Sequence, residues 1–300
     1  LSLYYSIINM KKTLLLLTIL LFVYSNKIFS QYTEIINSNR PGDSQSAFSV
    51  GSNVIQLETG GFILKEEHEL IENKVNGIGI DFMIRYGLIL EELEIQINGI
   101  YQNDKYTDMR SEIDNEFNRS NFRKFKIGAK YLVYDPYKNR DESPNLYSYW
   151  ANNKFKWNSL IPAISVYAGI NIDGKNNPYT AAGIKGVSPS FMIATQNNFK
   201  NNFVLICNLI LDRIGTDQND FEYILTLTHA FNTKWVSFIE NHGINSDFYA
   251  ENMVKLGAAY LSNENLQLDT SLAFNFKNTP KIFYINFGGS YRFDLHKDKK

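Results

Sequence analysis

The sequence predicts an all-β protein, a transmembrane antiparallel up-and-down β-barrel of about 12 strands that follows an N-terminal signal peptide. Three observations predict this fold. Apolar and polar residues alternate with a period of two through most of the chain after residue 50. The alternating segments are about ten to thirteen residues long, which is enough for a tilted strand to cross a bilayer. Short connections also alternate with longer polar ones, as they do in outer-membrane barrels.

The composition excludes several other classes of protein. The 300-residue chain is 44% hydrophobic but lacks the several apolar runs of about 20 residues that a helical membrane protein needs. Its single cysteine, Cys207, excludes a disulfide scaffold and a four-thiolate zinc site. A formal net charge of −1 provides no basic field for nucleic acid. The four histidines lack metal-ligand spacing, so we expect no metal and no cofactor.

The first thirty residues have the pattern of a signal peptide. The basic start Met10-Lys11-Lys12 precedes an apolar run over Thr13–Val23, which is too short to span a bilayer, and Ser30 is a small residue at a plausible cleavage point. We therefore expect residues 1–30 to be removed on export to the outer membrane, with Met10 as the true start. Residues 31–50 then form a periplasmic N-terminal segment.

Twelve segments show the alternation expected of strands. In the last one, Ile285, Phe287 and Tyr291 fall on one face, while Asn286 and Arg292 fall on the other. An even number of strands returns both ends of the barrel to the same side of the membrane. The expected strands are residues 54–64, 75–87, 92–103, 122–134, 161–172, 188–199, 203–213, 221–231, 234–243, 250–261, 266–276 and 281–293.

The lengths of the connections indicate which end of the barrel faces the periplasm and which faces outward. Tight links such as 199–202 suit the periplasmic side, and the polar stretch 106–121 is the clearest long outer loop. One periplasmic link, 135–159, is too long for this pattern, and we interpret it as a periplasmic insert with a short helix. The barrel itself spans residues 51–294 and ends in a charged tail at 295–300.

Alternation alone does not separate a barrel from a soluble β-sandwich, but three further features favour the barrel. The strands are long and even in number, whereas sandwich strands are often about five residues. No internal domain break is present. The chain also ends in an aromatic strand, in which Tyr291 and Phe293 resemble the signal that the barrel-assembly machinery reads. The sheet must close into a barrel because hydrocarbon cannot hydrogen-bond to the backbone groups of an open sheet edge. The expected partners are outer-membrane lipids, this machinery and a small-molecule solute.

Short blocks across most of the chain carry a family resemblance. The distinctive ones are Asn39–Phe48 (NRPGDSQSAF) and Arg85–Leu88 (RYGL), and Tyr291–Phe293 (YRF) ends the last strand. With these blocks the chain resembles the outer-membrane transporter family named after the meta-cleavage pathway of phenol degradation. It departs from the family at Gly42-Asp43 and in the 135–159 insert. The resemblance implies a twelve-strand outer-membrane barrel with a link to aromatic catabolism, but no particular solute.

If the apolar face of each strand meets lipid, the other face lines the lumen with six acids and six bases. Two interpretations remain open: a salt-bridged, filled interior that holds the barrel in shape, or a charged constriction that selects solutes. Lys124, Lys126 and Lys130 share one strand and would attract anions in the second case. The candidate lumen and selectivity residues are Glu58, Asp81, Arg85, Glu94, Lys124, Lys126, Lys130, Glu222, Glu240, Lys255, Asp269 and Arg292.

Arg40 and Pro41 lie before the first strand, outside the barrel pattern. We expect residues 31–50 to fold into the periplasmic mouth as a plug, in which Arg40 pairs with a lumen acid such as Glu58. The alternative is a loose periplasmic leader, because chain termini are mobile unless they are tied down.

The sequence therefore predicts passive movement of small molecules, hydrophobic or aromatic ones included, across the outer membrane. One alternative is a structural or binding barrel with a closed lumen. A second is a lipid-acting barrel enzyme that uses His229 or His242 with Ser237 or Ser246. Because no serine lies in a recognisable nucleophile motif, we expect no enzyme, and we expect both histidines to be polar side chains at the membrane interface.

Overall fold

The computed structural model describes residues 35–111, 115–138, 157–199, 202–246 and 250–296. The predicted signal peptide, most of the predicted 135–159 insert and the end of the charged tail lie outside the described residues. No helix within the described ranges is long and apolar enough to cross a membrane.

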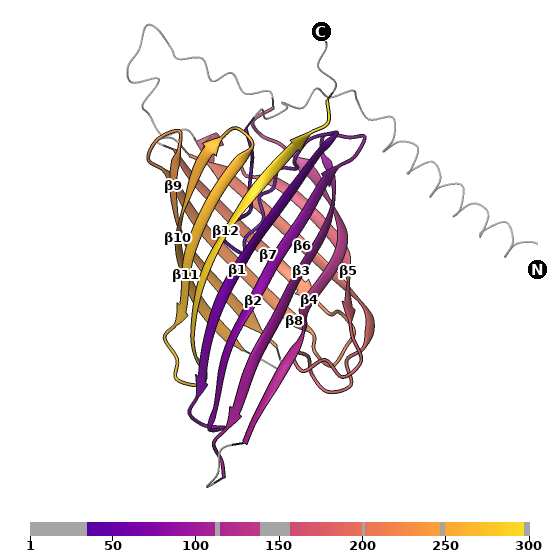
Figure 1. The fold of residues 1–300 in the computed structure, drawn as a ribbon. Coiled ribbons are helices and arrows are strands. Elements are labelled where there is room, and N and C mark those ends of the chain that lie inside the picture. The colour runs from indigo at the N-terminus through magenta and orange to yellow at the C-terminus, as the bar shows by residue number, and fades with distance from the viewer. Residues whose placement is uncertain (1–34, 112–114, 139–156, 200–201, 247–249, 297–300) are drawn as a thin grey trace, which may run out of the picture. The chain divides into compact units, whose positions relative to one another are not determined.

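The described residues form a closed antiparallel barrel of twelve strands, which confirms the predicted fold (Figure 1). Each strand pairs with its neighbours in the chain, and β1 closes the barrel against β12. A short 3₁₀-helix, η1 (Trp157–Leu160), precedes β5. The strands are β1 (Val54–His68), β2 (Asn73–Gly87), β3 (Leu93–Asp108), β4 (Asn115–Tyr134), β5 (Ala163–Asp173), β6 (Gly186–Asn198), β7 (Phe203–Asp212), β8 (Asp220–Ala230), β9 (Trp235–Asn245), β10 (Glu251–Asn263), β11 (Leu266–Asn275) and β12 (Lys281–Asp294).

The two ends of the barrel differ. We call the end where β1 begins and β12 ends the terminal rim, and the opposite end the far rim. The first four strands extend beyond the others at the far rim (Figure 1). The expected long loop over 106–121 is therefore wrong, because β3 continues to Asp108 and β4 starts at Asn115. This part of the hairpin is polar on both faces, so it lacks the alternation that marks a lipid-facing strand.

The outer wall is an apolar belt. Large aliphatic side chains such as Ile78, Ile80 and Ile239 are each at least half exposed. A continuous exposed apolar surface is rare in soluble monomers and suits contact with lipid. At the terminal rim the belt ends in aromatic pairs that include Trp235 with Tyr260, whose ring centroids lie 4.8 Å apart. Such aromatic side chains flank the apolar band of outer-membrane barrels.

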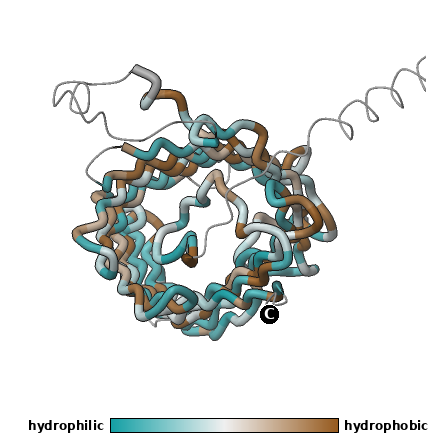
Figure 2. Tube along the Cα trace, turned by 90° about the horizontal axis from the view of Figure 1, so that it is seen from above, coloured by the Kyte–Doolittle hydropathy of each residue, from teal (hydrophilic) through white to brown (hydrophobic). Residues whose placement is uncertain are grey.

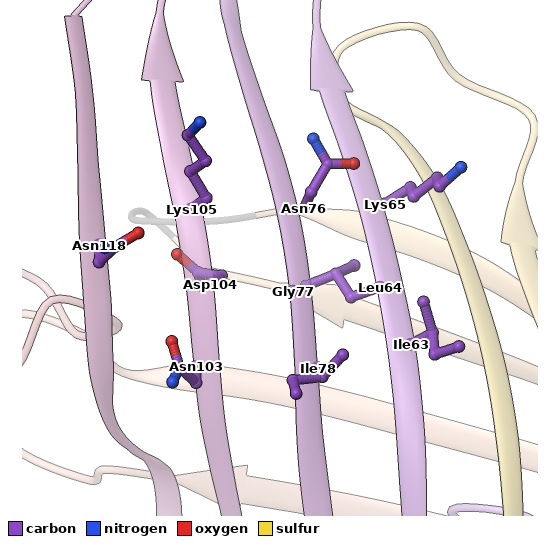
Figure 3. A pocket seen from close by; sticks show the side chains of 10 residues that line it. All are labelled: Ile63, Leu64, Lys65, Asn76, Gly77, Ile78, Asn103, Asp104, Lys105 and Asn118. Carbon is purple, nitrogen blue, oxygen red and sulfur yellow. The ribbon is translucent and has the colours of Figure 1, made fainter.

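Figure 3 shows the other edge of the belt, on the outer face of β1 to β4. A shallow groove of 380 Å³ runs over Gly77 between an apolar row that contains Ile63 and Ile78 and a polar row. Members of the polar row are register partners on successive strands. The groove therefore marks where the apolar belt ends. The polar row is Lys65, Asn76, Lys105 and Asn118.

Candidate functional site in the barrel lumen

The chain before β1 runs inside the barrel. Residues 36–50, called the lumen segment below, contact wall side chains of β1, β2, β3, β4, β6, β7, β9, β10, β11 and β12. Viewed along the barrel axis, a stretch of the chain crosses the space inside the ring of strands (Figure 2). One backbone hydrogen bond joins the Ile36 amide to the Glu264 carbonyl at 2.8 Å. Side chains of the wall thus supply most of the contacts that hold the segment.

Arg40 lies over the seam between β1 and β12. Its guanidinium donates to Asp81 of β2 and to both carboxylate oxygens of Asp269 of β11, at 3.1 and 3.3 Å. It also donates to the amide oxygen of Asn286 at 2.5 Å. Arg40 thus pairs with two of the predicted lumen acids, but the acid named as the example, Glu58, is not one of them. The carboxylate of Glu58 instead accepts from the backbone amide of the neighbouring residue 39 and from a wall arginine.

That arginine, Arg85, belongs to a buried charge cluster at the terminal rim. Its side chain is 0% exposed and contacts Glu58 at 3.2 Å and Glu94 at 3.0 Å. Lys130, also 0% exposed, lies 2.9 Å from Glu94. The cluster holds both ends of the lumen segment. Arg85 and Lys130 donate to the carbonyl groups of residues 37, 46 and 48, and Glu94 accepts the amide of residue 50.

A second cluster holds the middle of the lumen segment. Glu240 accepts the backbone amides of Asp43 at 2.9 Å and of residue 44 at 3.2 Å. A Cβ atom on Gly42 would lie 2.6 Å from a Glu240 oxygen, so the glycine allows this close approach. The Asp43 carboxylate contacts Lys255 at 2.5 Å and His242 at 3.3 Å.

The predicted lysine row is paired with acids. Lys124 lies 3.3 Å from both Asp212 and Glu222, and Lys126 lies 2.7 Å from Asp212. Asp212 was missed in the sequence because its strand carries apolar residues on both faces, which hides the inward positions. The carboxylates therefore neutralise these lysines at contact distance, and Lys130 is neutralised by Glu94.

All twelve predicted lumen residues lie on the inner face of the wall, and the terminal-rim cluster, the Glu240 cluster and the paired lysine row bring most of them together. Arg292 lies apart from these clusters, 2% exposed and 3.9 Å from Asp294. Sequence reasoning missed Asp212, Asp104 with Arg119, and Arg213 with Asp173. Three of these residues lie on strands near the far rim, where the predicted strands were too short or where alternation ends: Asp104, Arg119 and Asp173. The fourth, Arg213, lies in a loop.

Below the lumen segment, the barrel encloses a cavity of 640 Å³. Arg40 and Asp43 line it at one end, and Pro178 and Tyr179 at the other. Its wall combines charged and polar side chains with apolar ones, and two apolar patches stand out, which the expectation of a polar inner face did not foresee. The β5–β8 patch is Tyr167, Met192, Ile210 and Ile224. The β1–β12 patch is Phe62, Val75, Ile100, Met253 and Tyr284.

The connection between β5 and β6, residues 174–185, folds inward at the far rim. Its Tyr179 hydroxyl donates to the carbonyl oxygens of Gln102 and Arg119, each at 3.2 Å. The Arg119 guanidinium lies between two rings, 5.2 Å from the Tyr179 centroid and 4.8 Å from that of Tyr106. Burial, with the nearby Asp104 carboxylate, raises the pKa of the Tyr179 phenol well above its usual value. The hydroxyl therefore remains a donor at physiological pH.

The two candidate histidines have different surroundings. His242 lies in the lumen, where its Nε2 is 3.2 Å from Glu222, so the expected position at the membrane interface is wrong for this residue. His229 packs between Phe203 and Phe231, with ring centroids 4.2 and 4.9 Å away. Ser237 is its register partner on β9, but the His229 Nδ1 atom has no hydrogen-bond partner among the described residues.

A closed barrel with an apolar outer belt and a charged lumen is an outer-membrane β-barrel. The chain belongs to the family described as "Putative MetA-pathway of phenol degradation", which matches residues 38–293. No curated protein sequence matches the chain.

Three solved structures are similar to the chain. An outer-membrane channel from Pseudomonas putida F1 is 11% identical, with a TM-score of 0.51 over 85% of this chain and 100% of that chain. The transport unit of the autotransporter AIDA-I from Escherichia coli is 12% identical, with a TM-score of 0.48 over 90% of this chain and 96% of that chain. The P. putida toluene transporter TodX is 8% identical, with a TM-score of 0.44 over 85% of this chain and 99% of that chain. At 11% identity, the likeness to the P. putida F1 channel is one of fold.

Proposed function

We propose that the protein is a passive outer-membrane transporter for small molecules that carry an apolar or aromatic part. The observation that carries the proposal is the 640 Å³ cavity, which has two apolar patches on its wall. Cavities of roughly 300–1,000 Å³ hold one small organic molecule. The lumen segment separates this cavity from the terminal rim and is held mainly by side-chain contacts, so it can leave without breaking the sheet.

In this proposal the terminal rim faces the periplasm and the lumen segment is a plug. Four of the connections at this rim are short, at residues 88–92, 199–202, 231–234 and 264–265, as periplasmic turns are in outer-membrane barrels. The inward-folded connection 174–185 then covers the outer side of the cavity. Release of the plug would join the cavity to the periplasm.

An aromatic solute fits both the cavity and the family. The family description refers to phenol degradation, and Tyr167 and Tyr284 face the cavity from the two apolar patches. Aromatic rings favour offset or edge-to-face contact with other rings. The lysine row is neutralised by acids, so in our proposal it holds the wall in shape, and a strong preference for anions is not expected.

Export and assembly complete the proposal. Residues 1–30 act as the signal peptide, and the barrel-assembly machinery reads the last strand. Tyr291 and Phe293 lie on the outer face of that strand, 42% and 46% exposed, with ring centroids 4.6 Å apart. In this position they are available to the machinery and later to outer-membrane lipids.

Planar-bilayer recording of the refolded full-length protein tests the function. We expect discrete conductance steps that phenol reduces in a saturable way. Met192→Glu places a charge in the β5–β8 patch and should abolish the phenol effect. Lys105→Ala, on the outer face, is the matched control and should leave it unchanged.

Two results would favour the alternatives. A well-folded barrel that never conducts, even when the lumen segment is released, would favour a closed structural or binding barrel. Labelling by a serine-reactive probe would favour a lipid-acting enzyme.

A further inference from the structure

Four residues form one continuous row across the seam where the barrel closes. Asp81 of β2 is the register partner of Gly60 on β1, Gly60 is the partner of Gly288 on β12, and Gly288 is the partner of Asp269 on β11. Two carboxylates thus flank two glycines on the inner wall. The Arg40 guanidinium of the lumen segment occupies this row.

We propose that the Asp81–Gly60–Gly288–Asp269 row is a binding site for guanidinium cations, occupied by Arg40 in the closed barrel and open to guanidinium-bearing solutes. This inference goes beyond the proposed transport of apolar molecules. It concerns binding, and it holds whether or not the barrel conducts.

The shape of the row selects a flat cation. A Cβ atom at Gly60 or Gly288 would overlap the Nη2 atom of Arg40, so the glycines form a floor on which the planar group lies. Larger residues in these two positions would block the site. A guanidinium is planar, whereas an ammonium group is compact and has no need of a flat floor.

The acceptors match the fork of the guanidinium. One end donates to Asp81, while Nη2 and Nε donate to the two oxygens of Asp269. Asn286 accepts a further bond from Nη2 and uses its own amide to donate to Asp81 at 2.7 Å, which fixes that carboxylate. Bidentate pairing of this kind is specific to guanidinium groups.

A solute can reach the row from the cavity. Arg40, Asp81 and Asn286 all line the cavity, and the Asp81 side chain is 23% exposed. The Asp269 side chain is 0% exposed, so departure of Arg40 would leave a buried carboxylate without its cation. Because an unpaired buried charge is costly, the vacated row favours a replacement cation. A solute that binds there competes with Arg40 and shifts the lumen segment toward release.

The test uses the full-length Arg40→Ala variant in detergent, with methylguanidinium as the probe and trimethylammonium as a cation of equal charge. We expect millimolar methylguanidinium to raise the thermal unfolding midpoint in a saturable way, with an apparent affinity at least tenfold higher than that of trimethylammonium. Addition of Asp269→Asn should abolish the rise. Addition of Glu66→Gln, which removes an acid from the same cavity outside the row, should preserve it. Equal responses to both cations, or an unchanged response with Asp269→Asn, would overturn the proposal.

A second experiment covers the case in which Arg40→Ala does not fold. The otherwise native chain carries Ser44→Cys in a Cys207→Ser background, and a thiol reagent reports exposure of the lumen segment. Methylguanidinium should accelerate labelling several-fold, and trimethylammonium should not. The absence of any acceleration by methylguanidinium at concentrations that leave the barrel folded would contradict competition for the row. Because neither experiment measures current, both are independent of the proposed transport.

Discussion

Replacement of Arg85 by methionine should destabilise the barrel by about 3 kcal/mol, because breaking a buried ion pair costs about 3–5 kcal/mol. The Arg85 side chain is 0% exposed and bridges Glu58 and Glu94 at 3.2 and 3.0 Å. Methionine fills much of the volume but leaves Glu58 without its basic partner. Lys130 still neutralises Glu94 at 2.9 Å, so the cost falls at the lower end of the range.

Urea unfolding of the refolded protein in lipid vesicles measures this change in the free energy of unfolding. The matched control is Lys105→Met, which removes an ion pair with Glu116 whose two side chains are 50% and 49% exposed. Exposed pairs contribute only about 0–1 kcal/mol, so the control should be close to wild type. Adding Glu58→Gln to Arg85→Met should recover part of the loss, because the carboxylate left unpaired is then neutral.

An Arg85→Met barrel as stable as the Lys105→Met control would refute this reasoning. It would mean that water reaches Glu58 and Glu94 and that the terminal-rim cluster is not buried in solution. The same variant should also loosen the lumen segment, since Arg85 donates to the carbonyl groups of residues 37 and 48.

Three further predictions concern the lumen. Gly288→Ala should expel the Arg40 side chain, because the new methyl group overlaps its guanidinium, and thiol labelling of a cysteine at residue 44 should become faster. Asp212→Asn should cost about 3 kcal/mol in urea unfolding, because the buried Lys126 and the half-buried Lys124 lose a shared carboxylate that is itself 0% exposed; a loss below that of an exposed pair would be inconsistent with this burial. Tyr179→Phe should lower the free energy of local opening of the 174–185 connection by about 1 kcal/mol, because the one hydroxyl proton shared by two carbonyl oxygens is lost, with faster amide hydrogen exchange there and unchanged exchange in β9.

The alternation of side chains was enough to predict the barrel and its inner face. In β12, Ile285 and Phe287 point outward and Arg292 inward, as the pattern requires, because lipid on one side and a charged lumen on the other impose a period of two. The pattern failed where that contrast is absent. β4 extends to Asn115 through residues that are polar on both faces. Asp212 ends a strand that is apolar on both faces.

Contacts of the lumen segment were beyond the reach of the sequence. The Arg40 motif indicated a pairing with a lumen acid, but Asp81 and Asp269 lie 41 and 229 residues away in the chain. Their meeting depends on the register across the closing seam, which local alternation does not specify. His242 was misplaced for a different reason. Alternation puts it on the face of Glu240, which was predicted to line the lumen, but its position near a strand end favoured the membrane interface instead.

Control of passage by the lumen segment is the central claim, and a reversible disulfide tests it most directly. The Gln45 backbone amide donates to the Asn208 side-chain oxygen at 2.6 Å, and the Asn208 side-chain amide donates back to the Gln45 backbone carbonyl at 2.9 Å. The variant combines Gln45→Cys and Asn208→Cys with Arg40→Ala and Cys207→Ser. Single-channel recording should show a silent barrel when the disulfide is formed and discrete steps after reduction. Equal conductance in the two states would contradict the claim that the lumen segment closes the barrel.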